Sequence, residues 1–138
     1  RSCQESLRIV SPVNTTDDVV VPVDKVAACI DFVMDHSTDY PFNVLTLAHA
    51  GDGNLHFCAC KGNLDDKVWE KKLEEFHNEV YAYAYKIGGR LSGEHGIGAK
   101  KIKEMAKFTN PEELAVMKTI KKALDPQNIL NPGKLLDI

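Results

Sequence analysis

The sequence predicts an α+β fold, in which a ferredoxin-like antiparallel sheet carries helices on one face and is followed by C-terminal helices. Two observations indicate this class. The first two thirds of the chain read in the order strand, helix, β-hairpin and long amphipathic helix, and the remainder is helical. The 138 residues are enough to bury a core, so we predict a single domain over residues 1–138.

The first predicted elements are a strand at residues 17–23 and the helix that follows it. The strand sequence is DDVVVPV, which is rich in β-branched residues. Asp24 is placed to cap the helix, because its carboxylate can accept a hydrogen bond from a free backbone amide. One face of this helix is apolar and carries Val26, Cys29, Ile30, Val33 and Met34.

A β-hairpin is predicted from residues 42–50 and 54–60. Asp52-Gly53 favours a two-residue type I′ turn, whose central residues both have positive φ. Such a turn places His49 directly opposite His56. Neither face of the hairpin is polar, so we expect helices on one face and a partner domain on the other.

A long helix is predicted next, with Asn63 as its cap. Apolar residues recur every three or four positions along it, at Trp69, Leu73, Phe76, Val80, Tyr83 and Ile87. Gly88-Gly89 ends the helix. A short strand at residues 90–92 would complete the β-α-β-β-α-β order of the fold.

The C-terminal third is predicted to be helical. A helix over residues 98–106 carries lysines on a solvated face, and Asn110-Pro111 begins a second helix. Asp125-Pro126 ends this second helix. Its predicted buried stripe consists of Leu114, Met117, Ile120 and Leu124.

Composition excludes several functional classes. The net charge of −3 and the isoelectric point of about 5.9 give no electrostatic basis for binding nucleic acid or an anionic membrane. No apolar run reaches the roughly 20 residues of a membrane span, and no export signal is visible, so we expect a cytoplasmic protein. Reduced thiols are then expected at the four cysteines, Cys3, Cys29, Cys58 and Cys60.

Two segments carry candidate metal ligands. His49 and His56 flank the hairpin turn, and cross-strand neighbours are close enough for two imidazoles to reach one ion. Glu94 and His95 lie in a segment with five glycines in eleven residues, GGRLSGEHGIG. We predict His49, His56 and Glu94 as ligands of a divalent metal, and His95 as a general base beside it.

Each of these patterns also has a simpler interpretation. A cross-strand histidine pair can be a packing pair, and Gly-Glu-His-Gly can be an ordinary turn. The sequence alone does not show that the two segments meet. Cys58 and Cys60 share the strand face of His56, which allows a His/Cys zinc site, although small core residues explain them equally.

Three ordered motifs resemble a known family. They are HAGDGNLH at residues 49–56, SGEHGIG at residues 92–98 and DPQNILNPGK at residues 125–134, after a strand at residues 18–22. Together they resemble the C-terminal domain of FAD-linked oxidases of the vanillyl-alcohol-oxidase type. Within that type the similarity is to the group of D-lactate dehydrogenase, glycolate oxidase (its GlcD component) and D-2-hydroxyglutarate dehydrogenase, and it covers essentially the whole chain.

The resemblance implies roles for individual residues. In the family, the residues that match His49, His56 and Glu94 hold a divalent metal, which we expect to be Zn, Fe or Mn. The residue that matches His95 takes a proton from the substrate. An arginine that binds the substrate carboxylate falls near Arg1 when the sequence is counted back from the strand.

The resemblance also implies what lies around the chain. FAD is held mainly by an N-terminal domain, and nothing in this sequence resembles one, so we interpret the chain as a fragment that is inactive alone. The C-terminal tail packs toward the flavin in the family, which makes Asn131 a candidate cofactor contact. A lysine of the hydroxyglutarate branch falls at Thr16, which favours a shorter substrate such as lactate or glycolate.

The predicted function is therefore the substrate and metal domain of a flavin-dependent enzyme that oxidises a small D-2-hydroxy acid to a 2-oxo acid. Its expected partners are its own N-terminal FAD-binding domain and an electron acceptor, either an electron-transfer flavoprotein or an iron–sulfur subunit. Two alternatives remain open from the sequence. One is a free-standing metal-binding module without redox activity, and the other is an interaction domain whose glycine loops dock a partner.

Overall fold

The computed structural model describes residues 7–9 and 11–136. It falls into two compact units, Arg1–Glu94 and His95–Ile138, which are described separately. Arg1 and Cys3 lie outside the described residues. Our assignment of residues 1–138 to a single domain stays a prediction.

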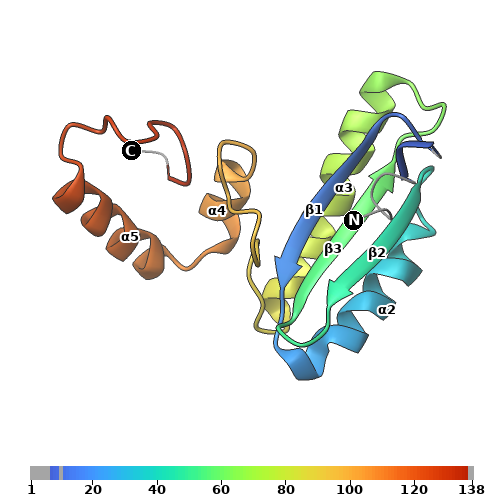
Figure 1. The fold of residues 1–138 in the computed structure, drawn as a ribbon, viewed down its shortest axis with the longest axis horizontal. Coiled ribbons are helices and arrows are strands. Elements are labelled where there is room, and N and C mark those ends of the chain that lie inside the picture. The colour runs from blue at the N-terminus through green and yellow to red at the C-terminus, as the bar shows by residue number, and fades with distance from the viewer. Residues whose placement is uncertain (1–6, 10, 137–138) are drawn as a thin grey trace. The chain divides into compact units, whose positions relative to one another are not determined.

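The first unit is a three-stranded antiparallel sheet with two helices on one face, as Figure 1 shows. The strand order is β1-β3-β2, which places the strand nearest the C-terminus in the middle. The elements are β1 (Asn14–Val20), η1 (Val23–Lys25), α2 (Val26–Ser37), β2 (Asn43–His49), β3 (Asn54–Cys60) and α3 (Asp66–Lys86). The predicted α+β class, with helices on one face, is confirmed.

The predicted fourth strand at residues 90–92 is reduced to a single bridge. Val20 and Arg90 exchange two backbone hydrogen bonds, of 3.1 and 2.8 Å, and the pairing goes no further. The chain leaves the sheet here because Ser92 and the amides after it bind the side chain of Asp18 and not the backbone of β1.

Both predicted helix caps in this unit are wrong by one or two residues. Asp24 lies inside the 3-10 turn, and α2 begins after Lys25 with no side-chain cap. In α3 the cap is Asp65, which accepts a hydrogen bond from the amide of Lys67 at 3.0 Å, and not Asn63. A carboxylate at this position also interacts favourably with the positive end of the helix dipole.

The core of the first unit lies between the sheet and its helices. Phe57 from β3 and Phe76 from α3 are almost completely buried, and their rings lie edge to face with centroids 6.0 Å apart. The same interface holds a polar group: Tyr81 donates a hydrogen bond to the buried carboxylate of Asp17, and His77 Nδ1 lies 3.8 Å from it. Asp17 is therefore bound on the helix-covered face of the sheet.

The second unit contains α4 (Ile102–Phe108) and α5 (Pro111–Leu124). The predicted start of α5 is confirmed, because Asn110 caps it and accepts a hydrogen bond from the amide of Glu112 at 2.8 Å. The predicted helix over residues 98–106 begins later, at Ile102.

The predicted buried stripe of α5 is wrong. Its members are Leu114, Met117, Ile120 and Leu124, and within the described structure no residue of α5 is buried. Ile120 is 54% exposed and Leu124 is 78% exposed. A unit with two helices and a tail has too little chain to surround this stripe.

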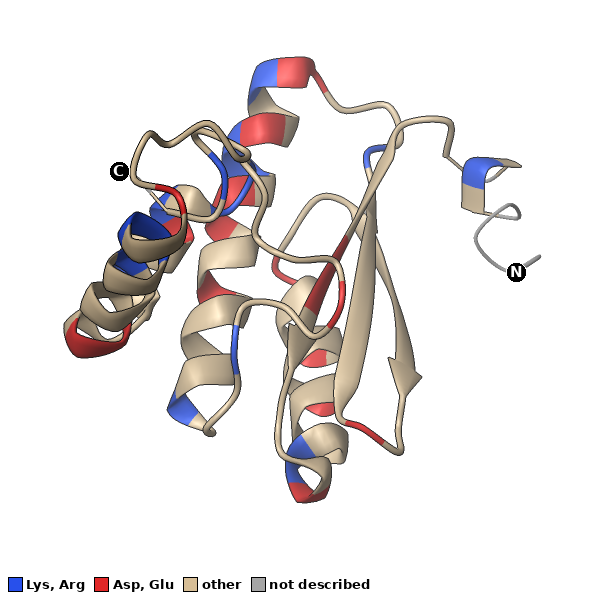
Figure 2. Cartoon of the chain, turned by 60° about the vertical axis from the view of Figure 1, so that its left-hand side comes forward, with Lys and Arg blue, Asp and Glu red and all other residues tan. Residues whose placement is uncertain are grey.

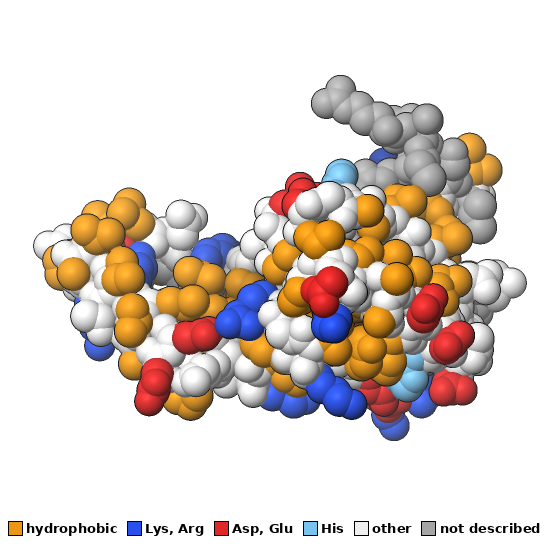
Figure 3. Space-filling view, turned by 90° about the horizontal axis from the view of Figure 1, so that it is seen from below, with side chains coloured by type: hydrophobic (Ala, Val, Ile, Leu, Met, Phe, Trp, Pro, Cys, Tyr) orange, Lys and Arg blue, Asp and Glu red, His pale blue; other side chains and the backbone are white. Residues whose placement is uncertain are grey.

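Charge is unevenly distributed over the elements. β2 and β3 contain no Lys, Arg, Asp or Glu, whereas β1 carries Asp17 and Asp18, the red segment of that strand in Figure 2. On the face drawn in Figure 3, charged side chains of both signs lie among apolar ones, and neither sign dominates. Among the described residues, no helix has the length and apolar character needed to cross a membrane.

Cys29, Cys58 and Cys60 are free thiols and are buried, as expected for a reduced protein. Burial raises the pKa of the Cys29 thiol to about 11 and also raises the pKa of the Cys60 thiol. Low thiolate content makes both cysteines poor nucleophiles at neutral pH.

Candidate metal centre

The hairpin that carries the two histidines has a longer turn than its sequence predicts. His49 pairs with Asn54, and His56 pairs with Leu47, so the histidines are diagonal neighbours and do not lie directly opposite each other. The predicted opposition of His49 and His56 is therefore wrong by two residues. A shift of two residues leaves every side chain on its predicted face, because strand side chains alternate with a period of two.

The longer turn has a physical cause in the side chain and backbone of the turn residues. Asp52 accepts a hydrogen bond from the amide of Asn54 at 3.1 Å, which closes the turn locally. The carbonyl of Gly53 accepts a hydrogen bond from Val21 at 2.9 Å, which ties the turn to the residue after β1. Gly53 has a φ of 78°, and a Cβ there would lie 2.0 Å from the carbonyl oxygen of Val21. Only glycine fits this contact.

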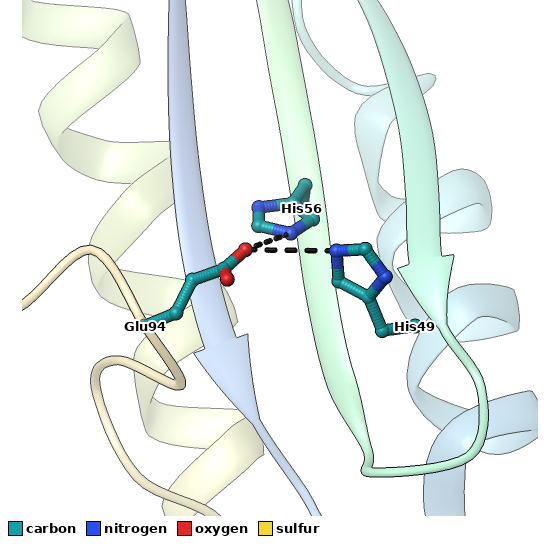
Figure 4. A group of neighbouring side chains, drawn as sticks. All are labelled: His49, His56 and Glu94. Carbon is teal, nitrogen blue, oxygen red and sulfur yellow. Dashed lines mark ion pairs between the residues drawn. The ribbon is translucent and has the colours of Figure 1, made fainter. Parts of the chain in front are cut away.

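The structure brings the three predicted ligands together on the face of the sheet opposite to the helices. Figure 4 shows His56 on β3, His49 at the end of β2 and Glu94 on the loop that follows Arg90. Glu94 Oε1 lies 2.9 Å from His56 Nε2 and 3.6 Å from His49 Nε2. The two imidazole rings are nearly perpendicular, with centroids 5.2 Å apart.

The donor set fits a divalent metal. One ligand atom from each of the three residues lies within 4.8 Å of the others. Bonds of about 2.0–2.1 Å in a tetrahedral site place ligand atoms about 3.4 Å apart, and the two distances from Glu94 lie on either side of that value. Two imidazoles and one carboxylate leave further coordination positions open to water or substrate.

Access to the cluster differs between its members. The side chain of His56 is 11% exposed, whereas those of His49 and Glu94 are 60% and 52% exposed. His56 is therefore fixed in the sheet, and the side of the cluster formed by His49 and Glu94 is open to a ligand.

Sequence reasoning missed Asp18, which holds the loop that carries Glu94. Asp18 is fully buried on β1. Its carboxylate accepts hydrogen bonds from Ser92 Oγ at 2.9 Å, from the amide of Gly93 at 2.8 Å and from the amide of Glu94 at 2.9 Å. The available signal was a charged residue inside an apolar strand, since a buried carboxylate needs several donors.

Gly93 is held from its other side by Asn54. A Cβ at Gly93 would lie 2.4 Å from Asn54 Oδ1 and 2.6 Å from Asn54 Cγ. Asn54 is the first residue of β3 and is 5% exposed. The loop thus lies between side chains of β1 and β3.

The remaining predicted site residues are not part of this cluster. His95 is exposed and is the first residue of the second unit, so its role as a base stays a prediction. Asn131 lies in the C-terminal tail, is exposed and has a φ of 49°. Cys58 and Cys60 pack with Leu7, and within the described residues the group of ligand atoms contains no cysteine.

The comparisons with known proteins cover nearly the whole sequence. The sequence profile of the family described as FAD linked oxidases, C-terminal domain, matches residues 3–135. The chain belongs to this family. The resemblance that we inferred from the three motifs is thereby confirmed.

Relatives of the FAD-linked oxidase domain include a D-lactate dehydrogenase of Anaerostipes hadrus, 39% identical over 118 residues, which are 86% of this chain and 25% of the relative. The glycolate oxidase subunit GlcD of Bacillus subtilis (strain 168) is 34% identical over 135 residues, 98% of this chain and 28% of the relative. The mitochondrial D-2-hydroxyglutarate dehydrogenase of Arabidopsis thaliana is 36% identical over 119 residues, 86% of this chain and 20% of the relative. The chain therefore spans about a quarter of the length of such relatives.

Proposed function

We propose that this FAD-linked oxidase domain binds the substrate and a divalent metal in an enzyme that oxidises a short D-2-hydroxy acid to a 2-oxo acid. The observation that carries the proposal is the convergence of His49, His56 and Glu94 from two distant segments. Family membership and the names of the relatives, D-lactate dehydrogenase and glycolate oxidase subunit, support the reaction class.

The protein's part in metal binding follows from the cluster. Nε2 of His49 and of His56 and Oε1 of Glu94 would hold the ion, and Zn, Fe or Mn each suit this donor set. A bound divalent metal supplies a Lewis acid that lowers the energy of the substrate alkoxide. The exposed side of the cluster leaves room for the hydroxyl and one carboxylate oxygen of the substrate.

His95 is the proposed proton acceptor. It follows Glu94 directly in the chain, and consecutive Cα atoms are about 3.8 Å apart. The imidazole would take the proton of the substrate hydroxyl, since its ordinary pKa lies near neutral pH. FAD, which the family implies, accepts the hydride from the substrate Cα and so takes up both electrons.

The size of the substrate is inferred from β1. The register pairs Thr16 with Cys58 and Asp18 with His56, so Thr16 lies one pair away from the cluster on the same face of the sheet. β1 offers no cation there to bind a second carboxylate. A monocarboxylate such as lactate or glycolate suits this position, and Arg1 stays the predicted partner of its carboxylate.

The proposal also includes the rest of the enzyme. An N-terminal domain would hold most of the FAD, with Asn131 as a contact from this domain. Electrons would leave through an electron-transfer flavoprotein or an iron–sulfur subunit, and the cytoplasmic location expected from the sequence belongs to the same proposal.

The test uses the full-length protein and three variants, with metal content and the rate of flavin reduction by D-lactate or glycolate measured under anaerobic conditions. His56→Ala should lose the metal and flavin reduction together. His95→Gln should keep the metal and slow flavin reduction. His36→Ala is the matched control, because His36 lies on α2 and pairs with Glu79, away from the cluster.

Two results would contradict the proposal. Wild-type metal content in His56→Ala would remove the histidine from the ligand set. Rapid flavin reduction by D-2-hydroxyglutarate and none by either short acid would show that the substrate class is wrong.

A further inference from the structure

The carboxylate of Asp18 occupies an unusual position for a charged group. It lies on the central part of β1, is completely buried, and faces the same side of the sheet as His56, its direct partner in the register. Burying a carboxylate is unfavourable unless several donors compensate for the lost water. The use made of those donors indicates what the buried charge does.

Three donors to Asp18 come from one short loop, residues 92–94. Ser92 donates its hydroxyl, and Gly93 and Glu94 donate consecutive backbone amides. The residue at the end of this loop is Glu94, whose side chain reaches both histidines. We propose that Asp18 is the positioning residue of the candidate metal centre, where it fixes the loop so that Glu94 meets His49 and His56.

The geometry favours this role over general support of the fold. β1 and the loop make no regular sheet beyond the bridge between Val20 and Arg90, so the backbone alone does not set the course of residues 92–94. The carboxylate replaces the missing backbone partners. Asp18 and His56 are neighbours in the sheet, so one pair of strands sets the position of both the loop and a histidine ligand.

Asp17 provides a matched comparison within the same strand. It is 1% exposed, against 0% for Asp18, and it also carries hydrogen bonds. Its partners Tyr81 and His77 belong to α3 on the opposite face of the sheet. Replacing either aspartate by asparagine removes an equally buried charge, but only one replacement releases the loop.

The inference rests on the proposed metal site, and its test separates the two. Asp18→Asn and Asp17→Asn are made in the full-length protein, and two quantities are measured. The first is the dissociation constant for Zn²⁺ or Mn²⁺. The second is the hydrogen-exchange protection of the Gly93 and Glu94 amides in metal-free protein. Thermal unfolding of both variants is recorded alongside.

Asp18→Asn should weaken metal binding by about 10- to 100-fold, the effect typical of losing a residue that orients a ligand, and should abolish protection of the two amides. Asp17→Asn should lower the unfolding temperature and leave metal affinity and amide protection unchanged. Ser92→Ala, which keeps the aspartate and removes one donor, should give a smaller loss of affinity and covers the case in which Asp18→Asn does not fold.

The outcomes distinguish the inference from the proposed function. Unchanged metal affinity in folded Asp18→Asn, or in Ser92→Ala if that variant alone folds, overturns the inference. Equal losses in Asp18→Asn and Asp17→Asn also overturn it, because they indicate general destabilisation. If the wild type binds no metal, the proposed function fails, and the exchange of the Gly93 and Glu94 amides alone decides whether Asp18 fixes the loop.

Discussion

Gly93 gives the sharpest test of how the loop is held against the sheet. A Cβ at this position would lie 2.4 Å from Asn54 Oδ1, whereas ordinary contacts begin near 3.4 Å. The difference between 3.4 and 2.4 Å requires a displacement of about 1 Å between the loop and β3. Asn54 is buried at the start of its strand, so the loop is the part that moves.

The size of the effect follows from that displacement. Overpacking of this kind costs about 1–3 kcal/mol, which corresponds to a factor of about 5 to 150 in an equilibrium constant. Because Glu94 follows Gly93 directly, we expect Gly93→Ala to weaken metal binding in the full-length protein by a factor in this range.

Two variants control for the substitution itself. Gly51→Ala lies in the hairpin turn between the histidines, where a Cβ meets nothing within 4 Å, and it should leave metal affinity unchanged. Asn54→Ala removes the colliding atoms, and within the described residues Asn54 Oδ1 accepts no hydrogen bond. The double variant Gly93→Ala/Asn54→Ala should therefore recover most of the lost affinity.

Isothermal titration with Zn²⁺ or Mn²⁺ measures all four proteins on one scale. Wild-type affinity in Gly93→Ala would refute the argument that the loop has no room for a side chain. Failure of the double variant to recover affinity would show that the collision with Asn54 is not the cause.

Three further predictions concern stability. Phe76→Ala should lower the free energy of unfolding by about 3–5 kcal/mol, because its ring is fully buried against Phe57; a urea-denaturation loss below half of that range would contradict the proposed core. Asp65→Ala should cost about 1 kcal/mol through loss of the α3 cap, and an unchanged denaturation midpoint would show that the cap is not used. The hydrogen bond from Lys121, with those from the amides of Leu130 and Ile129, lowers the pKa of Asp125. Since the folded pKa is the lower one, this contribution is present above the unfolded value of about 3.9 and is lost as the pH falls through the folded pKa; Asp125→Asn should remove that part of the acid transition followed by circular dichroism.

The side-chain faces of the hairpin were predictable although its register was not. The sequence places His49 and His56 on one face because strand side chains alternate, and this conclusion survives a shift of two residues. The turn length depends on Val21, which binds the carbonyl of Gly53 from another strand. No local pattern in the hairpin contains that information.

Asp18 was unpredictable for a similar reason. In the sequence it is one of two adjacent aspartates at the start of an apolar run, and both are buried. The partners of Asp17 lie on α3, and the partners of Asp18 lie more than 70 residues later in the chain. Only tertiary structure distinguishes a carboxylate that binds a helix from one that holds a ligand loop.

The apolar stripe of α5 illustrates the opposite case. Its spacing correctly predicted an amphipathic helix, and Asn110 and Pro111 marked where that helix begins. Periodicity identifies an apolar face but not the element that covers it. The burial of Ile120 and Leu124 was therefore an inference about a partner, and the described residues do not supply one.

The most direct test of the central claim is anomalous diffraction from crystals of the full-length protein grown with Zn²⁺ or Mn²⁺ and collected at the absorption edge of that metal. The account predicts one strong anomalous peak within bonding distance of His49 Nε2, His56 Nε2 and Glu94 Oε1. A fully loaded crystal whose anomalous peaks all lie away from these three atoms would contradict it.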